Sequence, residues 1–156
     1  MRGLIEMREG IIRPLVICVF HQEDTILVAE GYDPVKEDYF YRPIGGGIEF
    51  GETSEEALIR EMKEELDTAV TKLVYLGTLE NIFSFNGNTG HEIVRVYDAA
   101  FTDNFFNKAI TFEGIEDNGK KFKVLRLPIQ TFQSGELRLV PENLLNLLEM
   151  NGIAHK

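Results

Sequence analysis

The stretch GGGIEFGETSEEALIREMKEELD, from Gly45 to Asp67, joins a glycine-rich loop to an amphipathic helix. Within it, Glu61, Glu64 and Glu65 follow one another at spacings i, i+3 and i+4, which places them on one sector of a helix. Like charges at these spacings destabilise an exposed helix by about 0.2–0.5 kcal/mol per pair. A divalent cation such as Mg²⁺, which takes oxygen ligands from carboxylates, phosphates and water, reverses the sign of that contribution. The crowded carboxylates therefore indicate a cation site.

The helix has clear start and packing signals. Thr53 and Glu56 have the spacing of a capping box, and acidic residues in the first turn suit the positive end of the helix dipole. Leu58, Met62 and Leu66 form an apolar face that we expect to pack on the core. We expect the three glutamates to point away from that core.

The loop before the helix is rich in glycine. Its glycines are Gly45, Gly46, Gly47 and Gly51. They allow positive φ angles and a close approach of the backbone to a ligand, so we take Gly45 and Gly46 as candidate substrate-binding residues. A phosphate-binding P-loop is disfavoured, because the Gly-x4-Gly-Lys-Ser/Thr spacing is absent. A turn that merely connects a strand to the helix is the alternative.

From Gly46 onward the chain resembles the signature of the Nudix hydrolase family. The glycine is followed by five residues, Glu52, seven residues and then Arg60-Glu61-Met62-Lys63-Glu64-Glu65, and the likeness covers residues 46–68. Two positions depart from the family's pattern: Asp67 stands in place of a glycine and Thr68 in place of an apolar residue. Asp tolerates a left-handed backbone better than most residues, so Asp67 indicates a changed helix exit.

The resemblance implies a fold and a reaction. The fold is of the α/β (α+β) class, an α/β/α sandwich with a mixed central sheet. The reaction is hydrolysis of a pyrophosphate bond in a nucleoside diphosphate linked to another moiety, assisted by Mg²⁺ or Mn²⁺. Chemistry agrees with this, because an acidic site repels an anionic diphosphate unless metal ions lie between the two.

The resemblance also implies residue roles. Glu61, Glu64 and Glu65 are the metal ligands, with Glu64 a further ligand or the base that takes a proton from water. Arg60 is expected to orient the carboxylates, and Glu52 and Glu49 to lie at the loop edge of the same cluster. The sequence alone leaves a solvated acidic helix face as the alternative.

A further carboxylate outside the signature is expected from the resemblance. The candidates are Glu92, Glu113 and Glu116. We favour Glu92, because a strand end holds a carboxylate better than a glycine-containing loop does, which makes Arg60, Glu64 and Glu92 the candidate catalytic residues. The alternative for Glu92 is that it faces solvent.

Substrate recognition is less well specified by the sequence. Arg42 can hold a phosphate bidentately or pair with a surface carboxylate, and both interpretations remain open. Several aromatic residues near the loop and a later turn can stack on a nucleobase or belong to the core; they are Tyr39, Phe40, Tyr41, Phe83 and Phe85.

Composition restricts the remaining possibilities. A chain of 156 residues with 44% hydrophobic content is most simply one domain over residues 1–156. Its net charge of −10 argues against a nucleic-acid polymer as partner. Residues 49–67 hold eight acidic residues against Arg60 and Lys63, a local net charge of −6, which indicates a functional cluster.

Location and assembly follow from what the sequence lacks. The single cysteine, Cys18, cannot build a disulfide framework. No apolar run reaches the 18 residues of a membrane span, and the apolar residues 15–20 are too short for a signal peptide. We therefore expect a cytoplasmic protein without membrane association, and we leave a homodimer open.

Apolar alternation and turn residues predict the remaining elements. Strands are expected over residues 15–21, 25–30, 39–44, 70–85, 92–101 and 121–127, and a closing helix over residues 141–150. Asn86-Gly87 predicts a tight turn, and residues 112–119 are expected to be turn-rich.

Three functions are compatible with these observations. The first is a metal-dependent nucleotide pyrophosphatase. The second is a non-catalytic domain of the same fold that senses a nucleotide or nucleotide sugar, and the third is an acidic Ca²⁺-binding or protein-interaction domain. The presence of Glu61, Glu64 and Glu65 together favours the first, because a sensor has no need of all three.

Overall fold

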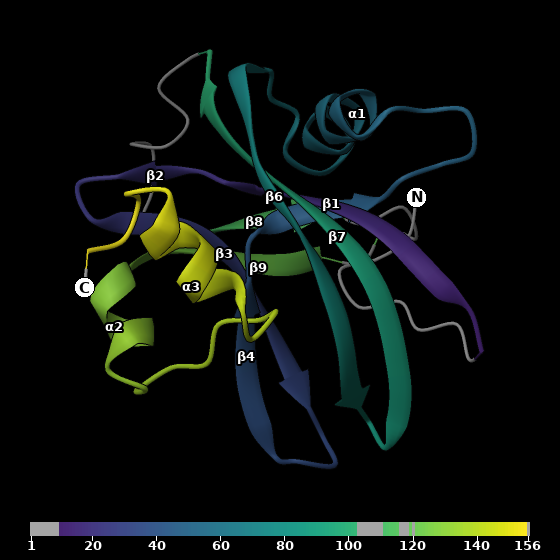
Figure 1. The fold of residues 1–156 in the computed structure, drawn as a ribbon, viewed down its shortest axis with the longest axis vertical. Helices are drawn as coiled ribbons and strands as arrows, with labels where there is room; N and C mark the ends of the chain where they lie inside the picture. The colour runs from purple at the N-terminus through teal and green to yellow at the C-terminus, as the bar shows by residue number, and fades with distance from the viewer. Residues whose placement is uncertain (1–9, 103–110, 116–118, 120, 156) are drawn as a thin grey trace.

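The computed structural model describes residues 10–102, 111–115, 119 and 121–155. In chain order its elements are β1 (Ile12–Val19), β2 (His21–Gln22), β3 (Thr25–Asp33), β4 (Asp38–Arg42), β5 (Ile44–Gly47), α1 (Ser54–Leu66), β6 (Val70–Phe85), β7 (Asn88–Phe101), β8 (Thr111–Ile115), β9 (Lys121–Pro128), α2 (Ile129–Gln133) and α3 (Leu144–Met150). α1 lies on one side of the strands, and α2 and α3 lie on the other (Figure 1).

The strands form two sheets. The first has the order β5-β1-β7-β6, in which β1 and β7 run parallel and the other neighbours antiparallel. The second has the order β2-β3-β9-β8 and is antiparallel, with β4 added beside β3. The predicted α+β class with a mixed sheet is confirmed.

Both faces of the central strands are buried. On β3, Ile26 and Val28 pack with residues of α2 and α3, whereas Leu27 packs with residues of α1. A strand that is covered on both faces needs apolar side chains at successive positions, which explains the apolar run of β3. The predicted α/β/α layering follows from these two cores.

Several element boundaries differ from the predictions. β3 runs on to Asp33, beyond its predicted end at residue 30, and the segment expected to be turn-rich overlaps β8. α3 begins at Leu144, because residues 141–143 form a turn in which the Leu144 N–H donates to the Pro141 carbonyl at 3.0 Å. Within the described residues, no helix is both long and apolar enough to cross a membrane.

Two hairpins, β3–β4 and β6–β7, extend from the same side of the molecule (Figure 1). Asn86 and Gly87 have φ angles of 51° and 81°, as a two-residue type I′ turn requires, so the predicted turn is confirmed. Asp33 Oδ1 accepts a hydrogen bond from the Asn86 N–H at 3.3 Å. Lys36 Nζ donates to the Ser84 carbonyl at 2.8 Å. These contacts tie the two hairpin ends together.

Candidate functional site

The start and end of α1 form as the sequence predicts. The Glu56 N–H donates to Thr53 Oγ1 at 3.1 Å, and the Thr53 N–H donates to Glu56 Oε1 at 2.9 Å, which completes the capping box. Asp67 ends the helix with φ 50° and ψ 45°, the left-handed conformation expected of it. Its carboxylate pairs with Lys63 at 2.7 Å, which stabilises this exit without a glycine.

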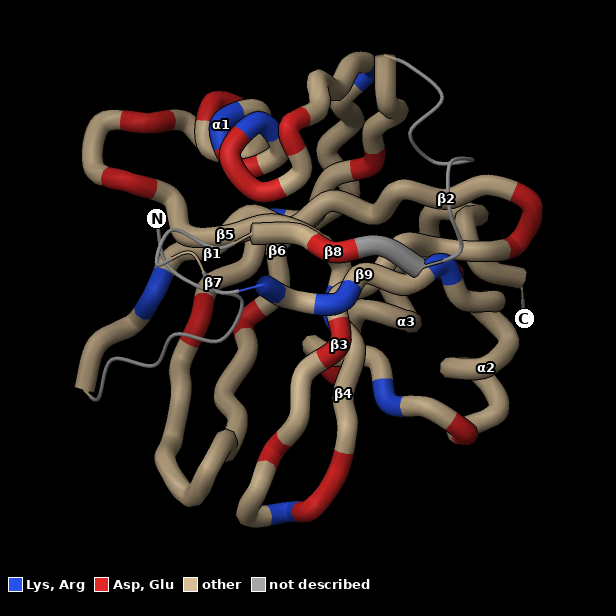
Figure 2. The backbone as a smooth tube through the Cα atoms, turned by 180° about the vertical axis from the view of Figure 1, so that it is seen from behind, with Lys and Arg blue, Asp and Glu red and all other residues tan. Residues whose placement is uncertain are grey.

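The acidic face of α1 is more buried than predicted. Leu58, Met62 and Leu66 are buried as expected, but Glu61 is 0% exposed and Glu65 5% exposed. Only Glu64 lies at the surface, with 42% of its side chain exposed. The expectation that all three glutamates point away from the core is therefore wrong for two of them. Figure 2 shows the acidic residues of the preceding loop and of α1 side by side.

The glycines of β5 account for this burial. A Cβ at Gly46 would lie 2.6 Å from Glu61 Oε2 and 2.5 Å from its Cδ, so only glycine lets this carboxylate lie on the strand. A Cβ at Gly45 would overlap the Val16 carbonyl of β1. These two glycines thus act through close approach, and the positive φ of the loop belongs to Gly51, at 92°.

Arg60 connects the carboxylates. Its Nε and Nη2 donate to the two oxygens of Glu52 at 2.7 and 2.6 Å, a bidentate pair. Its Nη1 donates to Glu61 Oε1 at 2.8 Å and to Glu64 Oε2 at 3.3 Å, and its Nη2 also donates to the Gly47 carbonyl at 3.1 Å. The hydrogen bond to Arg60 lowers the pKa of Glu52. Arg60 therefore positions carboxylates, as expected.

The donor set suits a hard divalent cation. Glu61 Oε2 is buried, and none of the described residues donates a hydrogen bond to it. Burial raises the pKa of Glu61, and hydrogen bonds with Glu65 and Arg60 act in the opposite direction without cancelling the rise. A hydrogen bond between two carboxyl groups needs a proton on one of them, and a bound cation satisfies the same oxygens.

The carboxylates are gathered here but not arranged as a closed metal cage. In the described part of the chain, no group of three or more His, Cys, Asp or Glu side chains has the geometry to hold a metal ion. Arg60 occupies the space among them, and Glu49 Oε1 lies 3.8 Å from its Nη1. Metal binding at Glu61 and Glu64 therefore requires their side chains to exchange contacts with Arg60 for contacts with the ion.

Arg42 and Glu92 form a buried ion pair that the sequence did not predict. Arg42 Nη2 donates to Glu92 Oε1 at 3.0 Å, and both side chains are 3% exposed. Asn81 Nδ2 donates to the same oxygen at 3.2 Å. Arg42 pairs with a buried carboxylate rather than with a surface one, and the solvent-facing alternative for Glu92 is wrong.

The strand register places Glu92 away from α1. Along β7, Val94 and Val96 pack with residues of α2 and α3, whereas Tyr97 and Ala99 pack with residues of α1. Because side chains alternate along a strand, Glu92 shares the face of Val94. The structure therefore does not bring Glu92 to the carboxylates of α1.

The other two candidates lie elsewhere. Glu113 is exposed on β8, a strand that contacts α1, and Figure 2 shows β8 running next to the helix. Glu116 lies outside the described residues.

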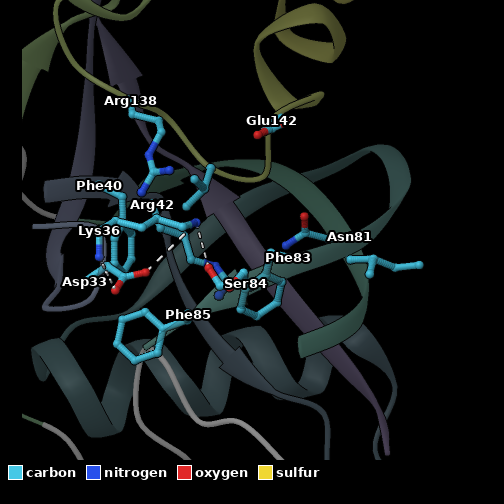
Figure 3. Close-up of a pocket in the computed structure, with 12 residues that line it drawn as sticks. Asp33, Lys36, Phe40, Arg42, Asn81, Phe83, Ser84, Phe85, Arg138 and Glu142 are labelled. Atoms are coloured by element: carbon cyan, nitrogen blue, oxygen red, sulfur yellow. Dashed lines mark hydrogen bonds and ion pairs between the residues drawn. The ribbon is translucent and has the colours of Figure 1, made fainter. Parts of the chain in front are cut away.

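A cavity of about 260 Å³ lies between the two hairpins, beside the Arg42–Glu92 pair (Figure 3). Of the aromatic candidates, Phe40, Phe83 and Phe85 line it, whereas Tyr39 is exposed and Tyr41 belongs to the core. The sequence interpretation missed its polar lining, which comprises Asp33, Lys36, Asn81, Ser84, Arg138 and Glu142. No local signal marks these residues, because they come from segments far apart in the chain.

Comparisons with known proteins agree with this architecture. The family described as NUDIX domain matches residues 12–141. No curated protein matches the chain. Among solved structures, the NUDIX hydrolase from Nitrosomonas europaea aligns with a TM-score of 0.63 and 16% identity, over 90% of this chain and 88% of that one.

Two further structures have a similar fold. The MutT NUDIX hydrolase from Burkholderia pseudomallei aligns with a TM-score of 0.56 and 20% identity, over 78% of this chain and 86% of that one. The E. coli ORF135 protein aligns with a TM-score of 0.50 and 17% identity, over 88% of this chain and 86% of that one. At such identities the structures share the fold, and the family match covers most of the chain.

Proposed function

This chain belongs to the NUDIX family, and we propose on that premise that it hydrolyses a pyrophosphate bond in a nucleoside diphosphate linked to another moiety, with Mg²⁺ or Mn²⁺ as cofactor. One observation carries the proposal: Arg60 draws Glu52, Glu61 and Glu64 into one cluster beside the glycines of β5. An acidic surface helix without this function has no need of such a cluster.

The carboxylates of α1 supply the oxygen ligands. Glu61, Glu64 and Glu65 would hold the ion, because their oxygens are hard donors gathered on one side of the helix. When bound, the ion polarises the phosphoryl oxygens and lowers the pKa of water. Gly45 and Gly46 leave the backbone of β5 free of side chains, so a diphosphate can approach it.

The remaining roles follow from exposure and contacts. Glu64 is the most exposed of the three glutamates and can accept a proton from water, provided that Arg60 releases it. Arg60 is a positioning residue, since its contacts with the described residues are all with carboxylates and the Gly47 carbonyl. For the carboxylate outside the signature, strand alternation favours neither Glu92 nor Glu113: Glu113 lies opposite Lys123, whereas the neighbouring Phe122 and Val124 carry the face that packs with α1. Glu116 is the remaining candidate of the sequence, outside the described residues.

A panel of nucleotides tests the proposal. The full-length protein would be incubated with Mg²⁺ or Mn²⁺ and nucleoside diphosphates linked to sugars, nucleosides or phosphate, and the phosphorylated products would be separated and identified. We expect release of a nucleoside monophosphate from at least one compound, abolished by EDTA. Binding of a nucleotide without any product would instead support the sensor, and a response to Ca²⁺ alone would support the third function.

A matched pair of variants makes the test specific. Glu64→Gln changes a glutamate of the cluster, whereas Glu55→Gln changes an exposed glutamate in the first turn of the same helix. We expect product release to be lost in the first variant and retained in the second. Equal activity in the two variants would contradict the proposed role of Glu64.

A further inference from the structure

The cavity between the hairpins is preformed by contacts among its walls. Asp33 Oδ1 accepts hydrogen bonds from the N–H groups of Val35 at 2.9 Å and Lys36 at 3.2 Å, besides that of Asn86. Burial raises the pKa of Asp33, but these backbone hydrogen bonds outweigh burial and lower it overall. Asp33 is therefore a fixed carboxylate that holds both hairpin turns, and the cavity does not depend on a ligand for its shape.

Two cations of the cavity lining are already engaged. Lys36 Nζ donates to the Ser84 carbonyl and lies 4.0 Å from Asp33 Oδ2, and Arg42 is paired with Glu92. A phosphate group at Lys36 or Arg42 would have to displace these partners. This end of the cavity therefore suits an uncharged part of a substrate better than a phosphate.

Aromatic rings form rigid walls for a planar group. The ring of Phe40 lies over Gly31, and that of Phe83 lies over its cross-strand partner Gly90, where a Cβ would overlap each ring. Phe85 packs edge-to-face with Phe40, with ring centroids 5.8 Å apart. Rings held in this way offer stacking surfaces to a nucleobase.

Two further charged side chains belong to the cavity lining. Arg138 and Glu142 both extend from the segment between α2 and α3, opposite Phe83 and Phe85 (Figure 3). Arg138 lies over the Phe40 ring, with its Cζ 5.9 Å from the centroid, and forms a long ion pair with Asp38, at 3.7 Å between Nε and Oδ2. Within the described residues, no hydrogen bond or ion pair engages the Glu142 carboxylate.

The Arg138 guanidinium and the Glu142 carboxylate carry opposite charges, and each presents two hydrogen-bonding atoms side by side. A guanidinium donates two parallel hydrogen bonds, and a carboxylate accepts two. Guanine is the base with two adjacent acceptors, O6 and N7, on one edge and two adjacent donors, N1–H and the 2-amino group, on another. Adenine pairs a donor with an acceptor and so matches an amide, but the amide of Asn81 already donates to Glu92.

We propose that this cavity binds the nucleobase of the substrate and selects guanine, with Arg138 donating to O6 and N7, Glu142 accepting from N1–H and the 2-amino group, and Phe83 and Phe85 stacking on the ring. The inference rests on the proposed function, since it assigns the base of a nucleoside diphosphate substrate.

The chain connects this cavity directly to the glycines of β5. Arg42 lines the cavity, and Gly46 follows it by four residues. Four residues span at most about 14 Å in an extended chain. The cavity wall at Arg42 therefore lies within the length of a nucleoside diphosphate from Gly46, as the proposal requires.

Binding of nucleoside monophosphates tests the assignment without any hydrolysis. GMP, IMP, AMP, UMP and CMP would be titrated into the full-length protein in EDTA by calorimetry. Because each bidentate contact discriminates strongly between bases, we expect GMP to bind about tenfold or more tightly than AMP, UMP and CMP. IMP, which lacks the 2-amino group, should lie in between.

Variants of the two reading residues sharpen the test. Arg138→Lys keeps the charge but loses the fork, and should reduce the preference for GMP over AMP. Glu142→Gln should bring GMP and IMP to similar affinities. Glu136→Gln changes an exposed glutamate of the same segment that does not line this cavity, and should leave all affinities unchanged. Melting temperatures would confirm that each variant is folded.

The outcomes separate this inference from the proposed function. Equal affinities for GMP and AMP, or a GMP preference unchanged in both Arg138→Lys and Glu142→Gln, would overturn the guanine assignment even if the protein hydrolyses nucleotides. A GMP preference that both variants reduce, in a protein that releases no product from any compound, would support the cavity and refute the hydrolase.

Discussion

Glu61 and Glu64 lie three residues apart on α1, yet their environments are opposite. Glu61 is fully buried against Gly46, whereas 42% of the Glu64 side chain is exposed. Glu64 can therefore exchange protons with water, while Glu61 is held by its surroundings. Substitutions at the two positions should report on different properties of the protein.

Glu64→Gln should affect catalysis without affecting folding. We expect kcat to fall by about 10²–10⁴-fold, the usual contribution of a general base, if Glu64 takes the proton from water. The free energy of unfolding should stay within about 0.5 kcal/mol, because the side chain is exposed. Both quantities would be measured beside Glu55→Gln, and a large loss of stability in the Glu64 variant would contradict this view of the residue.

Gly46→Ala should destabilise the fold through contact with Glu61. The added Cβ would lie 2.6 Å from Glu61 Oε2, and overpacking of this kind costs about 1–3 kcal/mol. Urea unfolding of Gly46→Ala, Glu61→Ala and the double variant would measure the coupling. We expect Gly46→Ala to cost less when Glu61 is already truncated, and strictly additive effects would show that this contact is not the cause.

At the scale of elements, α1 should respond to divalent cations. An ion that binds the crowded carboxylates of α1 only in the native state stabilises the fold. At a metal concentration one hundred times the dissociation constant, the free energy of unfolding rises by about 2.7 kcal/mol. We therefore expect the melting temperature to rise with Mg²⁺ or Mn²⁺. Glu65→Gln should reduce the rise and Glu55→Gln should not. A full metal response in Glu65→Gln would exclude Glu65 as a ligand.

The position of β8 beside α1 bears on the carboxylate outside the signature. Glu92→Gln, Glu113→Gln and Glu116→Gln would be compared at saturating metal and substrate. We expect Glu113→Gln to leave kcat nearly unchanged, because Glu113 lies opposite Lys123 on the face of β8 that alternates with the α1-facing positions of Phe122 and Val124. Glu92→Gln should act mainly on stability, since truncating one partner of a buried ion pair leaves Arg42 uncompensated. A large loss of turnover in Glu113→Gln would refute this placement of Glu113.

At the scale of the whole molecule, a second ion pair joins the two sheets, besides Arg42–Glu92. His21 on β2 lies 3.1 Å from Asp98 on β7, and the hydrogen bond to Asp98 raises the pKa of His21 more than burial lowers it. A raised histidine pKa stabilises the fold fully below the unfolded value of about 6.5, and the contribution is lost as pH rises through the folded value.

His21→Gln should therefore change the pH dependence of stability. The difference in melting temperature between the parent and the variant should be larger at about pH 5.5 than at about pH 8.5. The pair is partly exposed, so we expect a small effect that weakens with salt. A difference that does not vary with pH would show that the charge on His21 contributes nothing to stability.

The sequence by itself determined α1 and its chemistry. The capping box of Thr53 and Glu56, the left-handed exit at Asp67 and the apolar face of α1 all formed as predicted, because these features depend on residues at most four positions apart. The Nudix signature and the α+β class could also be predicted from the sequence alone. The Asn86-Gly87 turn is local too, since two adjacent residues set its φ angles.

Only the tertiary structure decided which side chains meet. Arg42 and Glu92 are 50 residues apart in sequence and lie in different sheets, on β4 and β7. Their pairing depends on how the two sheets pack and on the register of β7 beside β1, which sets the face that carries Glu92. A shift of one residue in that register would turn Glu92 to the other face. The burial of Glu61 on Gly46 and the meeting of Arg138 with Phe40 likewise depend on packing between distant segments, and no local pattern in the chain encodes them.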